Sequence, residues 1–193
     1  MNFEDIKNLV VQTRCTRRFK ADYKVDTKDI KEIIDLARQI SSAKNMQPLK
    51  YIIANDKKSF EIVHKPIKWA SHLKEWNQSE DEKPSAYIVI LNDTSIKGYA
   101  MVDLGSSIQT IMLALNAKGL SGCLLASIDK ELYKKEFDLA ENLEPMLAIA
   151  IGKGDEDIKI VDVKKDTNYY RDENDTHCVP KRDLNDILVK VYE

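Results

Sequence analysis

The stretch DLGSSIQTIMLALNAK, residues 103–118, carries the strongest helical pattern in the chain. Its large apolar residues recur at i, i+3, i+4 and i+7, the spacing of one helix face: Ile108, Ile111, Met112 and Leu115. Small Ala114 and Ala117 allow close packing, and Gly119 suits the position just after a helix end. A helix that is apolar over more than one face is expected to be buried on several sides.

Continuous apolar runs lie before and after this helix and predict buried strands: Tyr51–Ala54, Ala86–Leu91 and Pro145–Ile151. A shorter apolar run covers Cys123–Ala126. Further helices are expected at Phe3–Thr13, at Thr27–Ile40 with Thr27 as N-cap and Ser41 as the break, and at Lys130–Phe137. Because helices alternate with fully apolar strands, the pattern predicts a three-layer α/β or α+β fold.

Two regions lack such patterns. Lys57–Ser85 is polar and contains Trp69 and Trp76, and we expect a helix followed by a mobile, variable excursion. From Asp155 the chain is charged and irregular up to a late apolar cluster at Leu184–Val191. This composition predicts an extended C-terminal arm over about 155–193 that buries its end elsewhere.

Length and composition restrict the class of protein. With 193 residues, a single domain spanning 1–193 is expected. Lys and Arg total 30 against 32 Asp and Glu, so the formal charge is −2, which argues against bulk nucleic-acid binding. An apolar fraction of 43% excludes a wholly disordered chain.

The three cysteines, Cys15, Cys123 and Cys178, form no CxxC pair, so no zinc or thioredoxin-like site is expected. Free thiols fit a reducing compartment. The N-terminal residues do not resemble a secretory signal, and no run of about 18 apolar residues could cross a membrane. A soluble, cytoplasmic protein is therefore expected.

No nucleophile–base pair, metal motif or Walker sequence is present. His64 and His72 lie in the polar excursion, and we expect them to be solvated. The stretch Gly152–Gly154 has a weak likeness to a phosphate loop, but a strand-ending turn is the favoured interpretation.

Two basic groups and one polar loop remain as candidates for binding. Arg14, Arg17 and Arg18 lie within five residues, and guanidinium groups are suited to bidentate contacts with phosphate. A solvated basic face is the alternative. The pair Lys181 and Arg182 could converge on the same phosphate. The loop Ser41–Pro48 carries Asn45 and Gln47, whose amides could face a heterocycle, unless the loop is only a connection.

Taken in order, these elements make the chain similar to the FMN-dependent nitroreductase family. The matching elements are the following: Arg14-Cys15-Thr16-Arg17-Arg18-Phe19, Ser41-Ser42-Ala43-Lys44-Asn45-Met46-Gln47-Pro48-Leu49, Asp103-Leu104-Gly105, Gly119-Leu120-Ser121-Gly122, Ile149-Ala150-Ile151-Gly152 and Lys181-Arg182. Cys15 stands where the family usually has Ser, Ser41 where it has Pro, Leu49 where it has Trp and Ser121 where it has Gly.

The resemblance implies an α+β, three-layer fold with a mostly antiparallel sheet and a C-terminal arm exchanged in a homodimer. It implies that Arg14, Cys15, Arg17, Lys181 and Arg182 contact FMN, chiefly at the phosphate, ribityl chain and ring edge. The other subunit would contribute Ser41, Ser42, Ala43 and Asn45, and Gln47 belongs to the same loop. Leu125, Ala126 and Ser127 would pass along the flavin ring, with the N–H groups of Ala126 and Ser127 near N5 and O4.

The implied activity is a two-electron transfer from NADH or NADPH to a small electron-poor acceptor, such as a nitroaromatic or a quinone, by a ping-pong mechanism. The cofactor carries the chemistry, which accounts for the missing acid–base pair. Two alternatives stay open. One is a flavin-binding module for storage or sensing, without physiological turnover. The other is an anion- or nucleic-acid-binding domain, which the charge of −2 disfavours.

Overall fold

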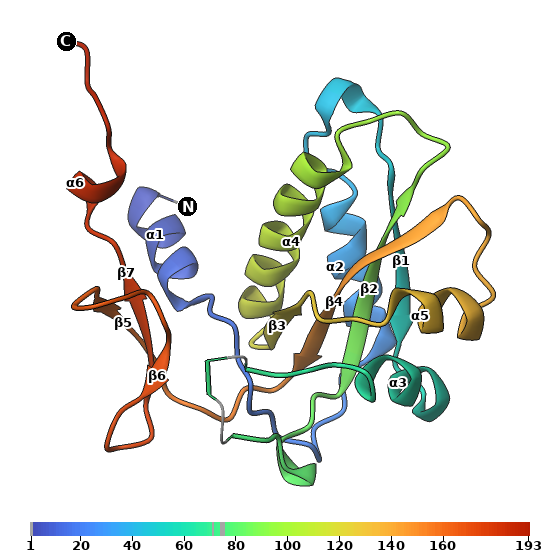
Figure 1. Cartoon of the computed structure of the whole chain (residues 1–193), viewed down its shortest axis with the longest axis horizontal. Coiled ribbons are helices and arrows are strands. Elements are labelled where there is room, and N and C mark those ends of the chain that lie inside the picture. Colours follow the sequence, from blue (N-terminus) through green and yellow to red (C-terminus); the bar gives the residue numbers. More distant parts are fainter. Residues whose placement is uncertain (1, 71, 74–75) are drawn as a thin grey trace. The chain divides into compact units, whose positions relative to one another are not determined.

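The computed structural model describes residues 2–70, 72–73 and 76–193 (Figure 1). The chain divides into two compact units. Met1–Trp69 with Gln78–Asp155 forms the first, and Ala70–Asn77 with Glu156–Glu193 forms the second. Each unit has its own β-sheet. The excursion expected at 57–85 includes residues 71, 74 and 75, which lie outside the described part of the chain.

The first unit is built on a four-stranded antiparallel sheet, which confirms the expected α+β class. Its two central strands are the most apolar runs of the sequence, as is usual for strands covered on both faces. The spatial order is β1 (Leu49–Ala54), β2 (Ala86–Asp93), β4 (Leu143–Gly152) and β3 (Ser121–Leu125).

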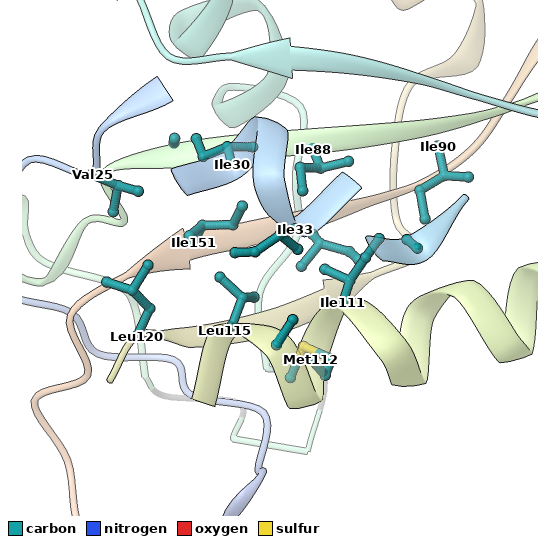
Figure 2. Close-up of a cluster of buried hydrophobic side chains, with 14 of the residues drawn as sticks. Val25, Ile30, Ile33, Ile88, Ile90, Ile111, Met112, Leu115, Leu120 and Ile151 are labelled. Carbon is teal, nitrogen blue, oxygen red and sulfur yellow. The ribbon is translucent and has the colours of Figure 1, made fainter. Parts of the chain in front are cut away.

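Alternate residues of the central strands fill two separate cores, which makes the unit three-layered. Ile88 and Ile151 belong to the core with α2 (Thr27–Ala37) and α4 (Ala100–Ala117) (Figure 2). On the opposite face lies the core of α3 and α5, which includes these strand residues: Tyr87, Val89, Ala148 and Ala150. The two outer helices of that face are α3 (Lys57–His64) and α5 (Lys130–Glu136) (Figure 1).

The helix predicted at 103–118 is α4, which begins three residues earlier, at Ala100. Gly119 follows it with φ of +68°, the left-handed conformation that glycine adopts at helix ends. The prediction for α2 needs two corrections. Its N-cap is Asp26, whose Oδ1 accepts from Lys28 N at 2.8 Å, whereas Thr27 is already helical. The helix ends at Ala37 and does not reach Ile40, because the backbone turns after Arg38.

Helix α1 (Phe3–Gln12) begins with a reciprocal capping box between Asn2 and Asp5. All ten of its residues are described, and none of them is buried. Its large apolar side chains are exposed: Phe3, Ile6, Val10 and Val11. The described residues leave this apolar helix face uncovered.

His64 is not solvated, so that prediction is wrong. The last turn of α3 places its Nδ1 2.6 Å from Tyr87 Oη, and its ring stacks on Phe60. Burial lowers the pKa of His64 and raises that of Tyr87. The histidine therefore supports the packing of α3 on β2. His72 is exposed, as expected.

The second unit corrects the expectation of an irregular tail. A three-stranded sheet forms in the order β5 (Ile158–Asp162), β7 (His177–Lys181), β6 (Tyr170–Arg171). Arg171 of β6 forms an ion pair with the buried Glu156, and Nδ1 of His177 in β7 lies 3.5 Å from the same carboxylate. After β7 comes the short helix α6 (Leu184–Ile187), and residues 184–193 are exposed.

Within the described residues, no helix has the length and apolar character needed to cross a membrane.

Candidate functional site

The segment after α1 is held at its start by the end of that helix. Thr13 Oγ1 donates to Leu9 O at 2.7 Å, and Arg14 Nη2 donates to Val10 O at 2.7 Å. Leu9 O also accepts from Thr13 N at 3.0 Å, and both acceptors are carbonyl groups of the last turn of α1. The Arg14 side chain is thus fixed in one orientation.

The same segment then runs along the edge strand β3. Cys15 pairs with Gly122 in a parallel bridge, and Thr16 N donates to Gly122 O at 2.9 Å. A Cβ at residue 122 would meet Met112 Sδ at 2.8 Å and Leu115 Cδ1 at 2.9 Å, so glycine lets β3 approach α4 without displacing these side chains. The candidate residues Arg14, Cys15 and Arg17 therefore lie beside β3.

The three arginines of this segment have different roles. Arg18 Nε forms an ion pair with Glu82 Oε1 at 2.8 Å, which directs Arg18 into the protein scaffold. The backbone oxygen of Arg17 accepts from Gln78 Nε2 at 2.8 Å. Arg14 Nε is buried and has no hydrogen-bond partner among the described residues. A fixed guanidinium with an unused buried donor fits an anionic group such as a phosphate.

The Cys15 thiol has an unusual electrostatic environment. A hydrogen bond from the Cys123 thiol lowers the pKa of Cys15 to about 6, and burial opposes this change. The Leu124 N–H and the positive charges of Arg17 and Arg14 lower the same pKa further. Cys15 is half-buried and Cys123 is buried. At neutral pH the Cys15 side chain is therefore largely a thiolate, the nucleophilic form of cysteine.

The residues after β3 differ in how they can contribute to a site. The Leu125 side chain is buried in the core of α3 and α5, so only its backbone could contact a ligand. Ala126 and Ser127 are exposed. Ser127 Oγ donates to Lys68 O at 2.7 Å. Ala126 borders a cleft of about 710 Å³, whose wall also includes Tyr99 and Met146.

The loop between α2 and β1 is anchored to α4 by one buried carboxylate. Ser42 Oγ donates to Asp103 Oδ2 at 2.5 Å, and Ala43 N donates to Asp103 Oδ1 at 2.9 Å. Gln47 N donates back to Ser42 Oγ at 2.9 Å, which closes the loop on itself. A short 3₁₀ turn, Ala43–Asn45, lies between these contacts.

Ser41, Asn45 and Gln47 are exposed in this loop, as are Lys44 and Met46. Gln47 Nε2 donates to Asn45 Oδ1 at 3.0 Å, so the two amides bond to each other. Each amide keeps part of its hydrogen-bonding capacity for a ligand.

Asp103 is the residue that sequence reasoning missed as part of the site. Only 2% of it is exposed. A signal was present, because Asp103 and Ser107 precede Ile111 and Leu115 at four-residue spacing on one buried stripe of α4. Ser107 Oγ lies 2.9 Å from Tyr51 Oη. Polar residues on an apolar stripe indicate buried hydrogen bonds.

The predicted site residues form two groups within one chain. Arg14–Arg17 lies beside Gly122, next to Met112 and Leu115 of α4. The Ser42–Gln47 loop is bound to Asp103, twelve residues from Leu115, which is about 18 Å along a helix. Lys181 and Arg182 are exposed at and after the end of β7 in the second unit. Their position relative to Arg14 stays a prediction.

The four-stranded antiparallel sheet between two helical layers defines a mixed α+β protein, in which Arg14 beside the edge strand keeps a buried donor unused. The model of the nitroreductase family matches residues 10–153. The chain belongs to the nitroreductase family, which assigns it to the oxidoreductases. The matched range begins within α1 and ends two residues before Asp155, where the first unit ends. It also includes Ala70–Asn77, which belong to the second unit.

Individual relatives agree with this assignment. The chain is 25% identical to 4-nitrobenzoate reductase of Pseudomonas putida, with 81% of this chain and 88% of the relative covered. It is 22% identical to a Bacillus subtilis protein provisionally named NAD(P)H nitroreductase YodC, with coverages of 71% and 83%. A solved structure from Parabacteroides distasonis, provisionally named NADH dehydrogenase/NAD(P)H nitroreductase, shares the fold with a TM-score of 0.68 at 18% identity, covering 98% of this chain and 97% of that one.

Proposed function

We propose that the protein is an FMN-dependent oxidoreductase that transfers two electrons from NADH or NADPH to a small electron-poor acceptor. The observation that carries this proposal is the buried, unpartnered Arg14 Nε, held beside β3 in a chain of the nitroreductase family. The name of the Pseudomonas putida relative favours a nitroaromatic acceptor, and a quinone is the other candidate.

Several residues of one chain would contribute to binding FMN. Arg14 and Arg17 would neutralise the phosphate, and Cys15 would face the ribityl chain or the ring edge. The exposed backbone at Ala126 and Ser127 would donate hydrogen bonds to the ring, where the cleft of about 710 Å³ begins. When bound, FMN supplies a ring that exchanges a hydride with NAD(P)H and electrons with the acceptor, each substrate using the same cleft in turn.

We propose further that the site is completed in a homodimer. The Ser41–Gln47 loop is anchored about 18 Å from the Arg14 segment along α4. In a symmetric dimer the loop of one subunit can approach the Arg14 segment of the other, and the exchange is reciprocal. The exposed apolar face of α1 and the exposed apolar residues of 184–193 are surfaces that a partner would cover.

Substitution of the proposed phosphate ligands tests the site. Arg14→Ala and Lys181→Ala are each expected to weaken FMN binding about tenfold or more, since a charge-assisted contact contributes roughly 1.5–3 kcal/mol. The measurement is titration of flavin-free protein with FMN. Lys31→Ala, which removes an exposed positive charge on α2, is the matched control and should bind FMN as the wild type does.

Equal affinities in the wild type, Arg14→Ala and Lys181→Ala would show that the phosphate lies elsewhere. A loss of FMN affinity in Arg14→Ala alone would support a phosphate site beside β3. It would also show that Lys181 does not take part in that site.

A further inference from the structure

Two cysteines that are far apart in the sequence meet at the edge of β3. Cys15 is bridged to Gly122, the residue that precedes Cys123 in the strand. The two thiols hydrogen-bond to each other, and Cys15 packs against the core cluster to which Cys123 belongs. None of the three cysteines, all of which are described, is in a disulfide.

We propose that Cys15 and Cys123 are a redox-active pair that forms a reversible disulfide when the protein meets a hydroperoxide. Cys15 is the attacked residue and Cys123 the resolving one. This assignment follows from exposure, because Cys15 is half-buried, whereas Cys123 is only 2% exposed.

The proposed reaction has two steps. The Cys15 thiolate attacks the terminal oxygen of the peroxide, the O–O bond breaks, and a sulfenic acid and a hydroxide or alkoxide ion result. The Cys123 sulfur then attacks the Cys15 sulfur, the S–O bond breaks, and the thiol proton leaves with the hydroxyl group as water. The two thiols lose two electrons, and the hydroperoxide gains them.

The surroundings favour the first step at Cys15. The charged groups that act on it are Arg17 and Arg14, and both stabilise its thiolate. The Leu124 N–H and the Cys123 thiol add hydrogen bonds to the same sulfur. The second step needs little rearrangement, because the two sulfurs are already in hydrogen-bond contact.

The third cysteine provides an internal control. Cys178 is also buried, but it lies in the second unit, where its Sγ is 3.8 Å from Asp172 Oδ2. Because Cys178 is only 4% exposed, it is expected to stay reduced under conditions that oxidise the pair.

The test exposes the purified protein, as isolated, to a small excess of hydrogen peroxide. The remaining thiols are then blocked with N-ethylmaleimide, and the protein is digested without reductant for mass spectrometry. A Cys15–Cys123 linked peptide is expected, with Cys178 alkylated, and dithiothreitol should reverse the link. Cys178→Ser should form the same link. Recovery of Cys15 and Cys123 as alkylated thiols, or of Cys15 as a sulfinic acid with Cys123 alkylated, would overturn the proposal.

A second variant separates this proposal from the proposed function. Cys123→Ser keeps a small polar side chain at a residue that is not among those proposed to hold FMN, so FMN affinity should stay within a few-fold of wild type. The linked peptide should be absent from it. A linked peptide in wild-type protein that binds no FMN would support the thiol pair and contradict the flavin assignment. FMN binding without a linked peptide would support the flavin assignment and contradict the thiol pair.

Discussion

Asp103→Ala is expected to lower the free energy of unfolding by about 3 kcal/mol and to weaken FMN binding at the same time. The carboxylate accepts hydrogen bonds from Ser42 Oγ and Ala43 N while almost fully buried. Each hydrogen bond to a charged group contributes roughly 1.5–3 kcal/mol, and its loss leaves a donor without a partner. The loop that is proposed to close the partner's site would lose its anchor.

Urea denaturation and FMN titration measure the two effects. Ser42→Ala removes one of the two hydrogen bonds to Asp103, together with the bond from Gln47 N, and is expected to cost about 2 kcal/mol. Asp103→Asn keeps the shape of the side chain but removes its negative charge, so it tests whether the charge is needed. A fully stable Asp103→Ala variant would show that the buried carboxylate does not support the loop. A destabilised variant with wild-type FMN affinity would separate the loop from the site.

Deleting residues 183–193 is expected to dissociate the proposed dimer and to release FMN. The apolar side chains of this segment that are at least half exposed in the single chain include these four: Leu184, Ile187, Leu188 and Val191. Covering the exposed part of each contributes on the order of 1 kcal/mol. Together they amount to about 4 kcal/mol for each arm, roughly a thousandfold in the dissociation constant.

Analytical ultracentrifugation over a range of concentrations, with absorbance detection of the flavin, checks this prediction. The deletion removes no residue of β5, β6 or β7, so the second unit should keep its sheet. Replacing Leu184, Ile187 and Leu188 with Ser in the full-length chain is the matched variant, since it keeps the length of the arm. A truncated protein that stays dimeric and flavin-loaded would contradict the role given to the arm.

The sequence predicted most of the first unit because its signals are local. The strands Ala86–Leu91 and Pro145–Ile151 are continuous apolar runs, and they became the two central strands of the sheet. The helix at 103–118 followed from spacing alone. The boundary at Thr27 was wrong because Asp26 and Thr27 are both good N-cap residues, and only the backbone geometry separates them.

Contacts between distant residues could not be predicted in this way. The ion pair of Glu156 with Arg171, and the burial of His177 beside it, turn a charged tail into a small sheet. The bonds of Asp103 to Ser42 and Ala43 also depend on the tertiary fold. Charged residues generally indicate exposure, and they mislead where they are paired in the interior.

The candidate binding residues were predicted from the order of motifs, and the structure shows how their surroundings differ. Arg14 and Arg18 looked equivalent in the sequence, but Arg18 is paired with Glu82, whereas Arg14 keeps a buried donor unused. Leu125 was expected along the flavin, yet its side chain is part of the core. The contact between Cys15 and Cys123 had no signal in the sequence.

The visible absorption spectrum of the purified protein, recorded under nitrogen before and after NADPH, tests the central claim most directly. We expect a yellow protein whose flavin absorbance bleaches within the mixing time and returns when 4-nitrobenzoate or a quinone is added. A flavin that binds but is not bleached by NADPH or NADH would indicate a binding module without turnover. A colourless protein that stays colourless after incubation with FMN would contradict the proposed function.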